Sequence, residues 1–176
     1  MQHPMSELAP YLNRKRAVLA LRQQDFTDAP HRALISISAS SFVAGGTGVR
    51  PVRIGNHQLV TDSAPGLAGH GLGPTAPELL LGALASCLVH TYLIHAALQQ
   101  LPVTGVIVDV SGRLDMGGVV GLAYQTPPQL EQITYVATVE GVTSHALLEP
   151  LHAAVGENCP VLNTLRLPTG VTRGDA

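Results

Sequence analysis

A long apolar helix constrains the fold of this chain more than any other segment. Thr75 and Glu78 form the Thr-x-x-Glu pattern of a capping box, and Pro77 lies in the first turn, where its missing N–H costs least. These signals predict a helix that runs from there to about Gln100. Its apolar residues cover most azimuths, so we expect a central helix that is buried nearly all round. These residues are Leu79, Leu80, Leu81, Leu84, Leu88, Val89, Leu93, Ile94 and Leu98.

The chain before this helix predicts an accessory helix and a small antiparallel meander. An imperfect helical pattern comes first, and the later apolar segments are separated by the turns Gly45–Gly48 and Gly55-Asn56. In chain order we expect a helix over residues 6–24, a connector over 25–31, strands over 33–43, 49–54 and 57–61, and a loop over 62–73.

The chain after the central helix predicts two strands and a further helix. The strands are expected over residues 103–114 and 130–139. Ser144 is expected to cap a helix that runs to Asn158, in which Pro150 either causes a kink or delays the regular part until after Glu149. Cys159-Pro160 should end that helix, and an extended stretch is expected over residues 161–167. The order of elements indicates an α+β fold.

Composition excludes several classes of protein. The 176 residues suit one domain, and the formal net charge of −2 without a basic patch argues against nucleic-acid binding. The apolar stretch Leu79–Leu98 is interrupted by polar residues, so we interpret it as a soluble core helix rather than a membrane span. The first residues have no apolar signal-peptide core, so we expect a cytoplasmic protein, in a reducing compartment that disfavours permanent disulfides.

The chain has only two cysteines, Cys87 and Cys159, and both lie in apolar surroundings. If the protein uses thiol chemistry, these residues must carry it. The alternative stays open at this point, because free cysteine is among the most frequently buried residue types and often acts as a small hydrophobe.

The frames around the two cysteines resemble those of the OsmC/Ohr family, the osmotically inducible and organic-hydroperoxide-resistance proteins. The similarity covers roughly residues 33–167, and the helix before it lies outside the similar region. We therefore expect an accessory helix and connector over residues 1–30 and a single OsmC-like domain over 31–176. The specific motifs are Gly73-Pro74, Pro77-Glu78-Leu79-Leu80-Leu81-Gly82-Ala83-Leu84-Ala85-Ser86-Cys87 and Cys159-Pro160-Val161-Leu162-Asn163-Thr164-Leu165.

The resemblance implies an intertwined homodimer, in which antiparallel sheets wrap around two central helices and two equivalent sites lie at the interface. It also implies that Cys87 is a peroxidatic thiol that becomes a sulfenic acid, and that Cys159 is the resolving thiol. The resulting disulfide would be reduced by an external dithiol such as a lipoyl group, with no metal or flavin. The apolar central helix favours an organic hydroperoxide as the substrate.

A buried thiolate needs a nearby cation, because burial alone raises the pKa of a thiol. The family places an arginine in the glycine-rich turn after the first strand. This chain has Thr47 after Gly45-Gly46, and Arg50 and Arg53 follow. Arg50 is the first candidate and Arg53 the second, and the alternative is that both are solvated charges at a strand edge.

The peroxidase branches also have a carboxylate ten residues before the first cysteine, where this chain has Pro77. Glu78 follows, and it serves either as that carboxylate or as a helix cap. One residue of displacement rotates a helical side chain by about 100°.

His90 shares the helix face of Cys87 and could tune the thiol. The cysteines and His90 are a weak pattern for a metal site, and we expect none.

The leading interpretation is a thiol-dependent peroxidase that reduces organic hydroperoxides. Two alternatives stay open from the sequence: a binding protein of the same fold for an apolar small molecule, and a two-thiol redox sensor without appreciable turnover.

Overall fold

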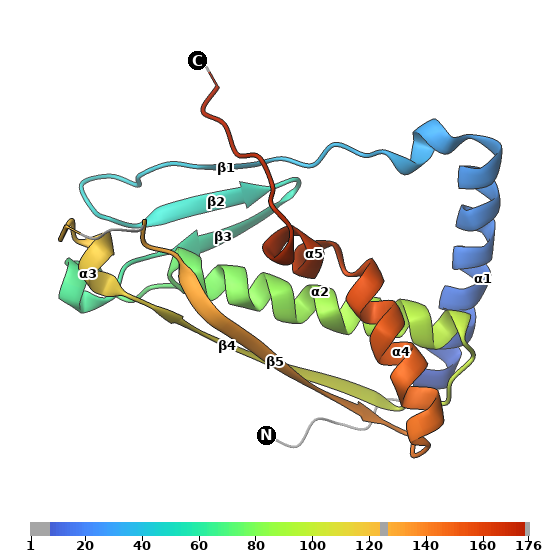
Figure 1. The fold of residues 1–176 in the computed structure, drawn as a ribbon. Helices are drawn as coiled ribbons and strands as arrows, with labels where there is room; N and C mark the ends of the chain where they lie inside the picture. Colours follow the sequence, from blue (N-terminus) through green and yellow to red (C-terminus); the bar gives the residue numbers. More distant parts are fainter. Residues whose placement is uncertain (1–7, 124–126, 175–176) are drawn as a thin grey trace. The chain divides into compact units, whose positions relative to one another are not determined.

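The structure is a computed structural model that describes residues 8–123 and 127–174 (Figure 1). Helices and antiparallel strands follow one another in the α+β order that the sequence predicts. The elements are α1 (Leu8–Asp28), η1 (Pro30–Ala33), β1 (Ala39–Ser41), β2 (Arg50–Ile54), β3 (His57–Thr61), η2 (Pro65–Leu67), α2 (Ala76–Leu98), β4 (Gly105–Leu114), α3 (Met116–Val119), β5 (Leu130–Glu140), α4 (His145–Asn158) and α5 (Pro160–Arg166).

The chain forms two compact units. One contains residues 25–82, and the other contains the described residues of the segments on either side, 8–24, 83–123 and 127–174. The division into an accessory segment over residues 1–30 and a domain over 31–176 stays a prediction.

The unit of residues 25–82 contains an antiparallel sheet in the order β1-β2-β3. The β2–β3 hairpin turns at Gly55-Asn56 as expected, with Arg50 opposite Thr61 and Ile54 opposite His57. The predicted strand over residues 33–43 is wrong for most of its length, because only residues 39–41 pair with β2. A strand requires a ladder partner, and β2 ends opposite Ala39. The expected connector over residues 25–31 is also wrong, since α1 continues to Asp28 and no proline interrupts the chain between Gln24 and Pro30.

A carboxylate organises the loop before α2. Asp62 is fully buried and accepts hydrogen bonds from the backbone N–H groups of Ser63 (2.7 Å), His70 (2.9 Å) and Leu72 (3.2 Å). These bonds lower the pKa of the Asp62 carboxyl, and the bond from His70 has the largest effect. The loop is therefore tied down at its base by a buried anion.

The other unit packs its helices against the two-stranded ribbon β4–β5. The strands are antiparallel, with Val108 opposite Ala137, and the register shifts between Ser111 and Arg113. Alternate residues of β4 and β5 pack against the core, as the two-residue period of a strand requires. They are Val106, Val108, Val110, Ile133, Ala137 and Val139.

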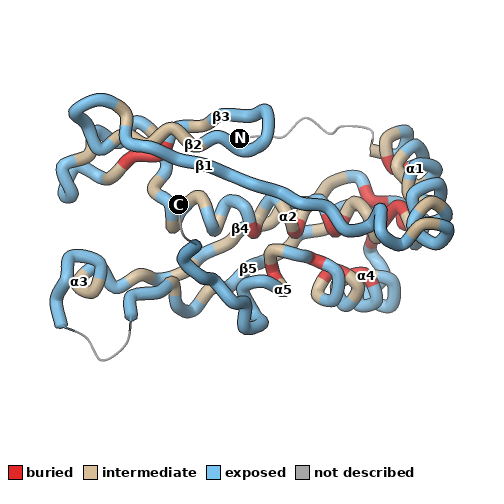
Figure 2. The backbone as a smooth tube through the Cα atoms, turned by 90° about the horizontal axis from the view of Figure 1, so that it is seen from above, coloured by how far each residue is buried: buried red, intermediate tan, exposed pale blue. Residues whose placement is uncertain are grey.

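The expectation that the central helix is buried all round is wrong for a single chain. Its buried residues all lie from Leu84 onward, and Leu80 is 39% exposed. Figure 2 shows intermediate and exposed stretches along α2 between the buried ones. One chain provides too few packed elements to surround the helix. α2 is long and apolar enough to cross a membrane by length and composition, a test that the core helix of a soluble protein also passes. The buried residues are Leu84, Leu88, Thr91, Tyr92, Ala96 and Ala97.

Two details near the C-terminus differ from the sequence predictions. α4 begins directly after Ser144, whose carbonyl accepts the first helical bonds while its hydroxyl makes no capping bond. Pro150 lies inside this helix without delaying its start. The predicted extended stretch over residues 161–167 is wrong, because residues 160–166 form α5. Pro160 is well suited to the first helical position, where an N–H would have no partner.

Candidate thiol redox site

The structure brings the two cysteines together. Cys87 Sγ and Cys159 Sγ lie 3.4 Å apart, although 72 residues separate them in sequence, and both thiols are free. A disulfide bond is about 2.0 Å long, so the sulfur atoms need to approach by only about 1.4 Å. The two thiols are therefore close enough to form a disulfide after a small rearrangement.

Each cysteine is held by a different local arrangement. Cys87 is half-buried on α2 between the buried residues Leu84 and Leu88, and Thr91 Oγ1 donates a hydrogen bond to its carbonyl oxygen (2.8 Å). Cys159 is fully buried at the junction of α4 and α5. Its N–H bonds to Val155 O (3.0 Å), so it ends one helix while it precedes the next. The helix junction fixes the position of the Cys159 thiol.

The surroundings of Cys87 favour its protonated form. Burial raises the pKa of the Cys87 thiol, and the neighbouring Cys159 thiol raises it further. The backbone N–H of Val161 opposes this by a hydrogen bond that favours the thiolate. Because Pro160 has no N–H, Val161 is the first residue of α5 that can donate one. The balance leaves the pKa above its ordinary value.

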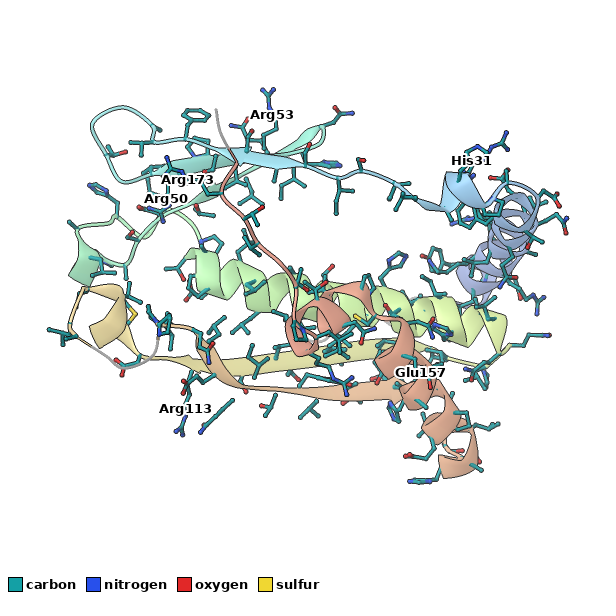
Figure 3. All side chains as sticks on the ribbon, turned by 45° about the horizontal axis from the view of Figure 1, so that its top comes forward. His31, Arg50, Arg53, Arg113, Glu157 and Arg173 are labelled. Carbon is teal, nitrogen blue, oxygen red and sulfur yellow. The ribbon has the colours of Figure 1, made fainter. Side chains whose placement is uncertain are left out.

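The candidate arginines lie on β2 (Figure 3). Arg50 Nη1 donates to Gly48 O (2.7 Å) and to Ser63 Oγ (3.4 Å), both in its own unit. Arg53 is exposed on the same strand, opposite Gln58. A role of either arginine in stabilising the Cys87 thiolate stays a prediction.

Glu78 caps α2 as the sequence predicts. Its Oε2 accepts hydrogen bonds from the backbone N–H of Thr75 (2.7 Å) and from Thr75 Oγ1 (2.8 Å), while Thr75 Oγ1 accepts the N–H of Glu78 (3.5 Å). The first of these bonds is the main cause of a lowered pKa of the Glu78 carboxyl. The carboxylate oxygen Oε2 is therefore engaged at the helix start, and a catalytic role stays a prediction.

His90 is exposed on α2, where partial desolvation and the nearby ammonium of Lys15 on α1 lower its pKa. A neutral imidazole changes the pKa of a nearby thiol only weakly. The predicted role of His90 stays a prediction. Across residues 8–123 and 127–174, no group of three or more His, Cys, Asp or Glu side chains is arranged to hold a metal ion.

The sequence did not reveal a second contact between the two helices. Tyr92 Oη on α2 lies 2.7 Å from His152 Nδ1 on α4. The position of Tyr92 on an apolar helix could have indicated a buried hydrogen bond, since a buried phenol requires a hydrogen-bond partner. Nothing local identified His152 as that partner.

A cavity of about 370 Å³ lies next to the helix segments that carry the thiols. Leu84 lies three residues before Cys87, and Leu162 lies three residues after Cys159. The lining is mainly apolar with one cation, which suits the hydrocarbon part of a small molecule. It consists of Leu84, Ile133, Tyr135, Leu162, Leu165 and Arg166.

Two free thiols in near contact, on helices that pack against an antiparallel ribbon, define a two-cysteine thiol protein of the α+β class. The family model described as OsmC-like protein matches residues 69–172, more than half of the chain. The chain belongs to the OsmC-like family, which confirms the resemblance seen in its cysteine motifs.

Several solved structures share the fold of this chain. An organic hydroperoxide resistance protein OsmC from Legionella pneumophila is 21% identical, with a TM-score of 0.59 over 76% of this chain and 90% of that one. An OsmC-like protein from Mycoplasma pneumoniae is 18% identical, with a TM-score of 0.62 over 75% and 88%. An organic hydroperoxide resistance protein from Elizabethkingia anophelis is 18% identical, with a TM-score of 0.58 over 76% and 89%. No curated protein matches the chain.

Proposed function

We propose that this protein is a thiol-dependent peroxidase that reduces organic hydroperoxides, with Cys87 as the nucleophile and Cys159 as the resolving thiol. The observation that carries the proposal is the 3.4 Å separation of the two free thiols. Relatives of the same fold bear the name organic hydroperoxide resistance protein, which supports the choice of substrate class.

The proposed cycle has three balanced steps. The Cys87 thiolate attacks the terminal peroxide oxygen, the O–O bond breaks, and the alkoxide takes a proton to leave as an alcohol while Cys87 becomes a sulfenic acid. The Cys159 thiol then attacks the sulfenic sulfur, which forms the disulfide and releases water. An external dithiol, such as a lipoyl group, reduces the disulfide by two thiol–disulfide exchanges and is itself oxidised. The cycle uses no metal or flavin.

We assign the apolar cavity between Leu84 and Leu162 to the hydrocarbon part of the substrate. Its volume of about 370 Å³ suits a small alkyl or aryl group, and apolar burial would favour an organic hydroperoxide over hydrogen peroxide. Arg50 is proposed to stabilise the thiolate once a hydroperoxide is bound, with Arg53 as the second choice. Glu78 is the candidate carboxylate partner, in addition to its capping bonds.

We further propose that the protein acts as a homodimer in the cytoplasm. Support comes from an apolar segment before and after β1 that one chain leaves uncovered, with Ile37 89% exposed and Phe42 64% exposed. A monomer seldom leaves so many neighbouring apolar residues in water. The segment consists of Leu34, Ile35, Ile37, Phe42 and Val43.

A second candidate function is a member of the same family without appreciable turnover, acting as a redox sensor or as a carrier of an apolar small molecule. Two observations favour it. The pKa of Cys87 is raised rather than lowered, and Glu78 makes capping bonds to Thr75.

The decisive experiment measures consumption of cumene hydroperoxide by the reduced protein with dihydrolipoamide, next to the variants Cys87→Ser and Cys159→Ser. We expect turnover by the wild type, none by Cys87→Ser, and at most one turnover by Cys159→Ser with dithiol absent. Equal inactivity of all three folded proteins would refute the peroxidase. Disulfide formation without recycling by dithiols would then indicate a sensor, and its absence a carrier.

A further inference from the structure

The hydrogen bond between Tyr92 and His152 joins the two helices that carry the thiols. The Oη–Nδ1 distance is 2.7 Å, and the two rings meet edge to face with their centroids 5.6 Å apart. Tyr92 is only 1% exposed, and its neighbours in the core are apolar. A polar contact of defined geometry inside an apolar helix interface fixes the relative position of the helices more sharply than apolar packing does.

The spacing along both helices ties this contact to the thiol pair. Tyr92 lies five residues after Cys87 on α2, about 7.5 Å along the helix axis and about 140° around it. His152 lies seven residues before Cys159, about two turns earlier along α4, so the two lie on nearly the same helix face. The thiol contact and the phenol–imidazole contact are therefore two separate points at which the same two segments meet.

Two separate contacts fix the orientation of α4 relative to α2, whereas a single contact would allow α4 to rotate about it. Without the contact at His152, α4 could rotate about its buried apolar residues Leu151 and Val155. This rotation would move its C-terminal end, where Cys159 lies. The sulfur atoms must close from 3.4 Å to about 2.0 Å to form a disulfide. A small change in the orientation of α4 therefore changes how readily the bond forms.

We propose that Tyr92 and His152 are positioning residues that hold α4 against α2, so that Cys159 stays within reach of Cys87 for disulfide formation. The inference rests on the proposed thiol chemistry and adds to it a determinant of how easily the disulfide closes. Both residues act through the helices and not on the reacting atoms. Burial raises the pKa of the Tyr92 phenol to about 12, so the phenol keeps its proton at neutral pH and is able to donate it in the contact with Nδ1.

The test is the equilibrium of the Cys87–Cys159 disulfide with reduced and oxidised glutathione, in which one protein disulfide and two glutathione thiols exchange for two protein thiols and one glutathione disulfide. Tyr92→Phe removes the hydroxyl and keeps the ring, and His152→Leu removes the ring nitrogen that it contacts. His152→Asn is the rescue variant, because its amide oxygen falls near the position of Nδ1. His145→Leu is the matched control, an exposed histidine on the same helix whose partner is Glu149.

Loss of one hydrogen bond should lower the equilibrium constant for the disulfide by about two- to tenfold. We expect this in Tyr92→Phe and His152→Leu, with His152→Asn and His145→Leu near the wild type. An unchanged constant in Tyr92→Phe and His152→Leu would overturn the inference, as would an equal loss in His145→Leu. If neither Tyr92→Phe nor His152→Leu folds, as judged by thermal unfolding, the pair is a requirement for folding and the positioning role is refuted.

The failure of this inference differs from the failure of the proposed function. A wild-type protein that forms no Cys87–Cys159 disulfide with either peroxide or oxidised glutathione refutes the thiol chemistry itself. A wild-type protein that forms the disulfide, together with Tyr92→Phe and His152→Leu variants that form it equally well, refutes only the positioning role.

Discussion

Alkylation of Cys87 by iodoacetamide should be slow at neutral pH and should accelerate as the pH rises. The pKa of this thiol is raised above its ordinary value of 9.0 by burial first, and then by the neighbouring thiol of Cys159. A thiol with a pKa above that value is about 1% or less ionised at pH 7, and the thiolate is the reacting species. The rate should therefore increase about tenfold per pH unit from pH 7 to 9.

The variant Cys159→Ala separates the two causes. It removes the neighbouring thiol and leaves most of the burial, so the pKa of Cys87 should fall below its wild-type value and alkylation at pH 8 should become faster. The variant also leaves Cys87 as the only thiol, so a single rate is measured. In the wild type, mass spectrometry of the two cysteine peptides distinguishes Cys87 from the fully buried Cys159, which should react more slowly.

The raised pKa of Cys87 also makes the stability of the fold depend on pH. The pKa of Cys87 in the folded protein lies above that of the unfolded chain, so the folded state binds this proton more tightly. The contribution is fully present below the pKa of the unfolded chain and is lost as the pH rises through that of the folded protein. Stability should fall above about pH 9 in the wild type and fall less in Cys87→Ala.

An alkylation rate that is already constant below pH 7 would refute this reasoning. It would show that a cation holds the thiolate, and Arg50→Ala should then move the profile to higher pH. If Arg53→Ala leaves the pH profile of the wild type unchanged, the cation is Arg50, the first candidate.

Three further predictions concern the cap, the core and the loop. Thr75→Ala should lower the thermal stability of α2 without changing peroxide turnover by the folded protein, and loss of turnover in a stable Glu78→Gln variant would instead show a catalytic carboxylate. Leu151→Ala should destabilise the protein by about 2–5 kcal/mol in urea unfolding, because this side chain is fully buried. Leu147 lies on the same helix and is 47% exposed, so Leu147→Ala should lower the free energy of unfolding by less than about 0.5 kcal/mol. Equal destabilisation by the two variants would contradict the assignment of the core. Asp62 has a lowered pKa, so its contribution to stability is present above the ordinary value of 3.8 and is lost as the pH falls through the folded-state pKa. Asp62→Asn should abolish this part of the acid dependence, and an unchanged acid profile would show that the three backbone bonds to the carboxylate contribute little.

Local signals predicted several elements correctly. The capping box at Thr75 and Glu78 needs only residues three apart, and the structure contains each of its hydrogen bonds. The hairpin at Gly55-Asn56 likewise depends on a turn and on the strands next to it. These features form between neighbours in sequence, so the sequence contains all the information that they require.

Two of the wrong predictions depended on a strand partner or on a choice between an extended and a helical conformation. Leu34, Ile35 and Ile37 give residues 34–38 strand character, but among the residues that the structure describes no ladder forms opposite them. Residues 161–165 have an apolar pattern that suits a strand or a helix, and the contacts of α5 at Leu162 with the core decide for the helix. Propensity alone is too weak to make such a choice.

The sequence by itself determined the α+β order, the long capped helix, and the membership of the OsmC-like family through the motifs around Cys87 and Cys159. Only the tertiary structure decided that the two sulfur atoms lie 3.4 Å apart and that Tyr92 finds His152 across the helix interface. The physical reason is that helix caps and turns are formed by residues near each other in the chain. Contacts between residues 60 or 72 positions apart exist only when the apolar core has brought α2, α4 and the ribbon together.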